Sequence, residues 1–144
     1  MVDSTLVLPP GSSLYGGFFE NWLRDPTAQA SAIQVKHPIG LLVSQAQTST
    51  WISGVALQAV APTDGGLNAI ALKLVDSKAV VLDRVQVRGS DLSVKPEWIK
   101  SGKNDFVAGS SYGVLALNVD RLEVLDSAIA VSYTHLTLPT ILLV

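Results

Sequence analysis

The sequence contains no cysteine, few charged residues and few aromatic residues. Without cysteine, the chain has neither a disulfide framework nor a thiolate metal site. No apolar run approaches the roughly 18 residues that a membrane-spanning helix needs, so we expect no membrane span. The formal net charge is −2, with acidic and basic residues intermixed, which argues against a nucleic-acid partner. What remains is a chain whose folding depends on burying aliphatic side chains.

Hydrophobic residues make up 48% of the sequence and charged residues only 15%, and the hydrophobic ones recur mainly at every second position. Such alternation is typical of strands that bury one face. No stretch sustains the 3.6-residue period of an amphipathic helix, so helices should be scarce. The sequence therefore predicts an all-β protein.

An internal repeat organises the chain. The segment Thr50–Leu57 aligns with Val80–Val87 at a separation of thirty residues, and with Leu122–Ile129 after a further forty-two. Each copy has two apolar positions, a short polar corner and two more apolar positions. A shift of the last copy by one residue would instead align Asp83 with Asp126, and the sequence leaves both alignments open. Repeats of this length indicate a stacked, repetitive architecture.

Each copy follows another alternating segment, so the repeating unit is three short strands separated by bends. The preceding segments are Leu41–Val43, Ala69–Leu74 and Gly113–Leu117. One unit corresponds to one coil of a parallel β-helix solenoid. Turn-forming residues at Ala61–Gly66 and Gly89–Ser111 predict loops that protrude from the solenoid, and Pro96–Lys100 fits one helical turn.

The N-terminal part predicts two strands, Thr5–Leu8 and Ser12–Tyr15, followed by a break at Gly16-Gly17. The phrase Leu14-Tyr15-Gly16-Gly17-Phe18, with Trp22, Arg24-Asp25-Pro26 and Ile33 after it, resembles the opening of many bacterial right-handed parallel β-helix surface proteins with a pectin-lyase-like fold. Ile70–Gly89 resembles the coils of the same family. In one departure, Gln34-Val35-Lys36 stands where the family usually has glycine.

This resemblance implies a short right-handed parallel β-helix from an exported protein, located outside the cell or at its surface. Most members of the family have no assigned function, but polysaccharide lyases and glycoside hydrolases share the fold. We therefore expect a non-enzymatic structural or adhesive module with glycans or surface proteins as partners. The alternative is a fragment of a carbohydrate-active enzyme without its catalytic coils.

The last fourteen residues resemble something other than an evolved protein. Val131–Thr140 matches, residue for residue, one translated frame of a transposase-based sequencing-library adapter, and Ile141–Val144 fits the remainder of such an adapter before its stop codon. We therefore expect residues 1–130 to be a partial β-helix domain truncated at both ends, with any signal peptide upstream. Residues 131–144 would be a non-native tail, in which Tyr133 and His135 carry no function.

The three tryptophans, Trp22, Trp51 and Trp98, are the best indication of a binding surface. Trp51 lies at an alternating strand position, from which an outward ring can stack on the apolar face of a sugar. The alternative is a ring that covers an apolar junction with a loop. Trp51 is the candidate ligand-stacking residue, and the sequence indicates no catalytic, cofactor-binding or metal-binding residue and no cofactor.

Other polar residues favour structural interpretations. His37 precedes a proline and has no second ligand or nucleophile near it in the sequence, which predicts a turn or surface residue. Asp83 and Asp126 suit solvated corners, although stacked carboxylates could bind a hard cation or act as an acid–base pair. Arg24-Asp25 predicts a local ion pair at the Gly16-Gly17 corner.

Two further patterns in the sequence do not form a catalytic or a phosphate-binding site. A basic residue of the kind that β-helix lyases use could be Arg84, Arg88 or Arg121, but no acidic cluster accompanies them. Asp64-Gly65-Gly66 predicts a turn and not a phosphate-binding loop, because no Lys-Ser/Thr pair and no helix follow it.

Overall fold

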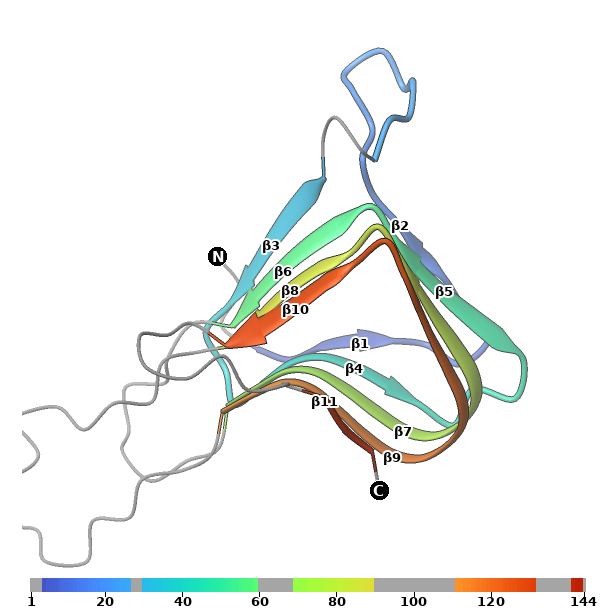
Figure 1. Cartoon of the computed structure of the whole chain (residues 1–144). Coiled ribbons are helices and arrows are strands. Elements are labelled where there is room, and N and C mark those ends of the chain that lie inside the picture. Colours follow the sequence, from blue (N-terminus) through green and yellow to red (C-terminus); the bar gives the residue numbers. More distant parts are fainter. Residues whose placement is uncertain (1–3, 27–29, 60–68, 90–110, 132–140, 144) are drawn as a thin grey trace, which may run out of the picture.

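The structure, a computed structural model of the chain, describes residues 4–26, 30–59, 69–89, 111–131 and 141–143. These residues form an all-β fold in which every strand pair of the two sheets is parallel (Figure 1). The predicted all-β class is therefore confirmed. The strands are β1 (Leu6–Leu8), β2 (Leu14–Tyr15), β3 (Ser31–Val35), β4 (Ile39–Ser44), β5 (Ser49–Ser53), β6 (Val55–Ala59), β7 (Ala69–Asp83), β8 (Gln86–Gly89), β9 (Ser111–Leu125), β10 (Ala128–Val131) and β11 (Ile141–Leu143).

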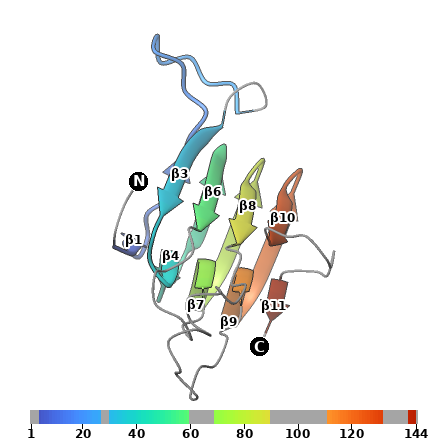
Figure 2. The ribbon, with the colours of Figure 1, turned by 90° about the vertical axis from the view of Figure 1, so that its left-hand side faces the viewer.

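The strands lie along three sides of a triangular outline (Figure 1). The first side holds β1, β4, β11 and the first halves of β7 and β9, and the second holds β2, β5 and the second halves of β7 and β9. Both sides belong to one curled, seven-stranded sheet, because β7 and β9 bend through the corner between them. The third side is the four-stranded sheet, in which β3, β6, β8 and β10 lie side by side (Figure 2).

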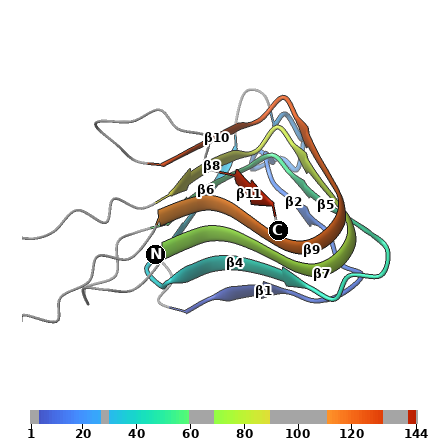
Figure 3. The same cartoon turned by 60° about the horizontal axis from the view of Figure 1, so that its bottom comes forward.

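The chain visits the three sides in the same order four times before β11 returns to the first side (Figure 3). The strand register agrees with the first of the two sequence alignments: Thr50 pairs with Val80, and Val80 pairs with Leu122. The alignment shifted by one residue is wrong, because Asp83 pairs with Leu125 and not with Asp126. The predicted protruding loops and the helical turn at Pro96–Lys100 lie outside the described residues.

Aliphatic side chains from successive turns of the chain stack into columns inside the triangle. Ile52, Leu82 and Val124 occupy equivalent positions in three neighbouring strands, and Ile52 and Leu82 are fully buried. The first and third sides have further columns of inward aliphatic residues at paired positions. They are Leu41–Leu72–Val114, Val43–Leu74–Ala116 and Leu57–Val87–Ile129. Burial at about 25 cal/mol per Å² of apolar surface makes these columns the main source of stability.

The corners depend on residues with left-handed backbone conformation. Two corners have a residue with positive φ in each of three successive turns. At the first corner these residues are Gln45, Asp76 and Asn118, and at the second they are Gly54, Arg84 and Asp126. Across the second corner, Gly54 N–H donates to Asp83 O and Arg84 N–H to Leu125 O, at 3.1 and 2.9 Å. The interstrand hydrogen bonding therefore continues through the bend.

Glycine is required where the first turn meets the second. A Cβ on Gly54 (φ +70°) would lie 2.5 Å from the carbonyl oxygen of Gly16, and a Cβ on Gly16 would lie 2.5 Å from that of Gly54. Gly17 has a φ of +84°. The break predicted at Gly16-Gly17 is thus a close approach of two backbones, where no side chain fits.

Candidate ligand-binding surface

Trp51 points outward from the second side of the triangle. Its neighbours in β5, Thr50 and Ile52, are buried, whereas Trp51 is 38% exposed. The backbone N–H of Trp51 donates a 3.0 Å hydrogen bond to Ser13 Oγ, which precedes β2. Trp51 therefore has the orientation that the alternation predicts, in a strand held on both sides.

The outer face around Trp51 consists of two rows of side chains that cross β5, β7 and β9. The rows are Trp51–Val81–Glu123 and Ser49–Ala79–Arg121. Val81 is buried although it points outward, so the side chains around it cover it. Arg121 Nη2 and Glu123 Oε1 form an ion pair. Because adjacent strands are about 4.8 Å apart, this pair lies about 10 Å from the strand that carries Trp51.

A hollow of about 160 Å³ lies between the Trp51 ring and the Arg121–Glu123 pair. Ala79 and Val81 provide its floor, because their side chains are smaller than those on either side. Ligand pockets for drug-sized molecules are larger, roughly 300–1,000 Å³. The hollow therefore suits one ring-sized group, with Trp51 among its lining residues on β5 and a hydrogen-bonding ion pair on β9.

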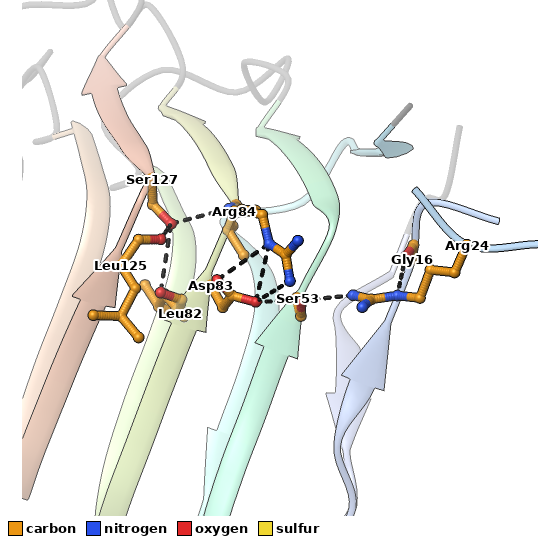
Figure 4. Close-up of polar contacts among 9 residues, drawn as sticks. Gly16, Arg24, Ser53, Leu82, Asp83, Arg84, Leu125 and Ser127 are labelled. Carbon is orange, nitrogen blue, oxygen red and sulfur yellow. Dashed lines mark hydrogen bonds and ion pairs between the residues drawn. The ribbon is translucent and has the colours of Figure 1, made fainter. Parts of the chain in front are cut away.

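A polar network connects three turns of the chain at the second corner (Figure 4). Asp83 accepts hydrogen bonds from Ser53 Oγ at 3.0 Å and from Arg84 Nη2 at 2.9 Å. Ser53 Oγ in turn accepts a 2.6 Å bond from Arg24 Nη2, and Arg24 Nε donates to Gly16 O at 2.9 Å. Arg24 thus supports the Gly16-Gly17 corner through its bonds to Gly16 and Ser53, and the predicted ion pair of Arg24 with Asp25 stays a prediction.

These contacts determine the protonation of the corner pair. The hydrogen bond from Arg84, together with one from Ser53 and the positive charge of Arg84, holds the pKa of Asp83 below its usual value against the opposing effect of burial. The hydrogen bond to Asp83 correspondingly raises the pKa of Arg84. Both groups are charged at neutral pH and engaged with each other, which fits a structural clip better than a general base.

The other residues considered from the sequence lie apart from one another. His37 is in a turn, where Nδ1 lies 2.8 Å from Thr5 Oγ1 and 3.3 Å from the backbone nitrogen of Ile39. Arg88 lies on the outer face of the third side, in a shallow hollow that it shares with Gln58 and other side chains. Trp98 and the turn at residues 64–66 lie outside the described residues.

A hairpin is the feature that the sequence did not reveal. Phe18 and Arg24 form an antiparallel bridge, and Trp22 N–H closes the turn by donating to Phe19 O at 2.9 Å. This hairpin projects from the corner above β2 and β3 (Figure 1). The available signal was the concentration of aromatic residues in a segment without strand alternation.

Within the described residues, no group of three or more His, Asp or Glu side chains could hold a metal ion. That part of the chain also has no helix long and apolar enough to cross a membrane. No protein-family model, no curated protein and no solved structure matches the chain.

Proposed function

We propose that the chain is part of a right-handed parallel β-helix that acts as a non-enzymatic adhesive module of an exported bacterial surface protein. The four passes of the chain over the same three sides, in a constant order, support the β-helix. The columns of inward aliphatic residues and the corners with positive φ support it further, because they recur in equivalent positions of successive turns.

The observation that carries the proposed activity is the hollow that the outward Trp51 shares with the Arg121–Glu123 pair and with the small side chains of Ala79 and Val81. Sugars present apolar C–H faces that stack on aromatic rings, and hydroxyl groups that both donate and accept hydrogen bonds. A guanidinium donates and a carboxylate accepts, so the ion pair matches both properties of a hydroxyl group. The proposed ligand is a neutral pyranose unit of a glycan.

Charge favours a neutral sugar over a uronic acid at this surface. Glu123 would repel a ligand carboxylate, and Arg121 is already paired with Glu123. A uronate would have to displace Glu123 from Arg121 before it could form its own ion pair, whereas a hydroxyl group fits beside the existing pair.

The test is calorimetric titration of the full chain with neutral hexose oligosaccharides and, separately, with oligogalacturonate. We expect weak binding of the neutral sugars, with affinity reduced about tenfold or more by Trp51→Ala, because an exposed stacking contact of one to two kcal/mol is lost. Trp51→Phe should retain part of the affinity. Trp22→Asn, on the hairpin, is the matched control and should bind as the wild type does.

Two results would contradict the proposal. Binding that Trp51→Ala leaves unchanged would place the ligand elsewhere on the chain. Release of reducing ends or of unsaturated uronate products during the titration would show that the chain is an enzyme.

A further inference from the structure

The hairpin Phe18–Arg24 displays apolar side chains in solvent. Trp22 is 82% exposed and Leu23 66% exposed, and Phe18 and Phe19 are each more than one-third exposed. None of the four belongs to the hydrophobic core. Exposed aliphatic and aromatic residues concentrated in so short a segment indicate an interaction surface.

The backbone conformation at the tip of the hairpin is energetically unfavourable for Trp22. Trp22 has a φ of +64°, a conformation that glycine or asparagine adopts easily and a bulky side chain rarely does. Glycine or asparagine would close the same turn without this cost. A bulky, exposed residue in a strained conformation points to a function for its side chain rather than for the turn.

The base of the hairpin is held firmly. The guanidinium of Arg24 lies over the rings of Tyr15 and Phe18, with distances from Cζ to the ring centroids of 5.4 and 5.9 Å. The same group bonds to Gly16 O and Ser53 Oγ, and Gly17 N–H donates to Ser31 Oγ at 3.0 Å. The tip is therefore presented in a fixed orientation, which lowers the entropic cost of binding.

Both faces of the hairpin are apolar. Phe18 shares one face with Arg24, which lies over it, and with Trp22, whose ring centroid is 6.3 Å away. Phe19 and Leu23 are joined by a 2.8 Å backbone hydrogen bond one position further along the two arms, and from strand alternation we infer that their side chains lie on the opposite face. A protein partner contacts one face of such a finger, whereas a lipid environment surrounds it.

Size and charge also favour a lipid surface. One seven-residue hairpin is too small to bury the roughly 800 Å² per partner of a stable protein–protein interface. The hairpin carries Glu20 at its turn, and its single basic residue, Arg24, is engaged at the base. Anionic lipids attract clusters of Lys and Arg, which are missing here, so the matching surface is electrically neutral.

We propose that the hairpin Phe18–Arg24 is a shallow membrane anchor that inserts its aromatic tip into the interfacial region of a zwitterionic lipid bilayer. Tryptophan prefers this region, where one part of the ring is in an apolar environment and its N–H is hydrated. The glycan-binding proposal does not depend on this anchor, because Trp51 and the hairpin are separate features of the chain.

The experiment uses the full chain with Trp51→Phe and Trp98→Phe, which leaves Trp22 as the only tryptophan, and vesicles of phosphatidylcholine. We expect a blue shift of Trp22 emission and quenching by lipids brominated in their acyl chains. High salt should not weaken binding, and added phosphatidylglycerol should reduce it. Trp22→Asn, assayed by vesicle flotation, should lower the partition coefficient about tenfold, since one large side chain no longer leaves water.

A stability control for Trp22→Asn and one further variant make the outcome decisive. Asparagine tolerates positive φ, so Trp22→Asn should keep the hairpin, and an unchanged urea-unfolding midpoint would verify this. Leu23→Ser, on the opposite face, should also weaken flotation several-fold. The proposal is overturned if phosphatidylcholine causes no shift, if binding requires anionic lipid, or if only one face of the hairpin matters. That last pattern would indicate a protein pocket.

Discussion

Two valines in the same strand differ completely in burial. Val114, in the first half of β9, has no exposed surface, whereas Val124, in the second half, is 38% exposed. Both side chains point into the triangle; Val114 pairs with Leu72, and Val124 pairs with Leu82. Beyond β9, β11 pairs with Val114–Ala116, and no described strand pairs with the outer edge near Val124.

The difference shows that burial in this fold comes from the neighbouring turns and not from the strand itself. A strand flanked on both sides is sealed, and a strand flanked on one side leaves its inward residues partly in water. In the proposed β-helix, stability is approximately a sum of contributions from each turn and from each interface between turns. Each interface therefore contributes separately, and variants on the two kinds of turn should differ in a predictable way.

The largest effect should come from Gly54, which lies between two turns. We expect Gly54→Ala to lower the free energy of unfolding by about 3 kcal/mol, because alanine is disfavoured at φ +70° and its Cβ would meet the Gly16 carbonyl. Gly11→Ala is the matched control: its φ is +83°, but no atom lies within 4 Å of the added Cβ. It should cost about 1 kcal/mol. Equal losses in urea denaturation would show that the close backbone approach is unimportant.

The comparison of the two valines can be tested directly. Val114→Ala should destabilise the chain by about 2 kcal/mol, and Val124→Ala by under about 1 kcal/mol, because less apolar surface leaves water at an open edge. Chemical denaturation followed by circular dichroism measures both. Identical losses would mean that the second half of β9 is covered in solution.

Deleting residues 132–144, which removes β11 and leaves β10 whole, sharpens the same comparison. Without β11, we expect the cost of Val114→Ala to fall to that of Val124→Ala, so the two changes should be non-additive in a double-mutant cycle. Additive effects would show that β11 does not contribute to burying Val114. β11 pairs in register with β9, because an open strand edge presents unpaired backbone N–H and C=O groups to another strand.

Much of the fold could be predicted from local pattern. The segment Thr50–Leu57 carries its register because its inward positions are mostly apolar in every turn, Thr50 being the exception, and a shift by one would reverse inside and outside. The sequence did not decide between Leu125 and Asp126 as the partner of Asp83, because the polar corner lacks this constraint. The backbone hydrogen bond from Arg84 to Leu125 decides it.

The surroundings of Trp51 were less predictable than its direction. Alternation alone indicates that Trp51 faces outward, but its partners Arg121 and Glu123 are about seventy residues away in the chain. Their position depends on the length of the insertion between β8 and β9, which the pattern of strands does not constrain. The hairpin was missed because it interrupts the alternation between β2 and β3, and its hydrogen bonds involve few residues.

A smaller effect is expected inside the sealed part of the stack. Thr50 is buried in the column Thr50–Val80–Leu122, and its Oγ1 has no hydrogen-bond partner within the described residues. Thr50→Val should therefore stabilise the chain by about 1 kcal/mol, since an unsatisfied hydroxyl group is replaced by a methyl group of the same shape. Thr48→Val, at an exposed position, is the control and should change the thermal midpoint little. A destabilised Thr50→Val would indicate a buried water that bonds to the hydroxyl group.

The smallest effect concerns the Asp83–Arg84 ion pair at the second corner. The pKa of Asp83 is lowered in the folded chain, mainly by the hydrogen bond from Arg84, so the carboxylate stabilises the fold above its unfolded pKa of about 3.8. This contribution should disappear as the pH falls through the lower, folded-state pKa. Asp83→Asn should therefore cost up to about 1 kcal/mol at pH 7, and this cost should shrink below pH ~4. Urea unfolding at several pH values measures it, with Arg84→Gln as a second variant that should weaken the same dependence. If wild type and Asp83→Asn lost stability in parallel below pH ~4, the clip would not connect successive turns, and the corner would depend on its backbone hydrogen bonds alone.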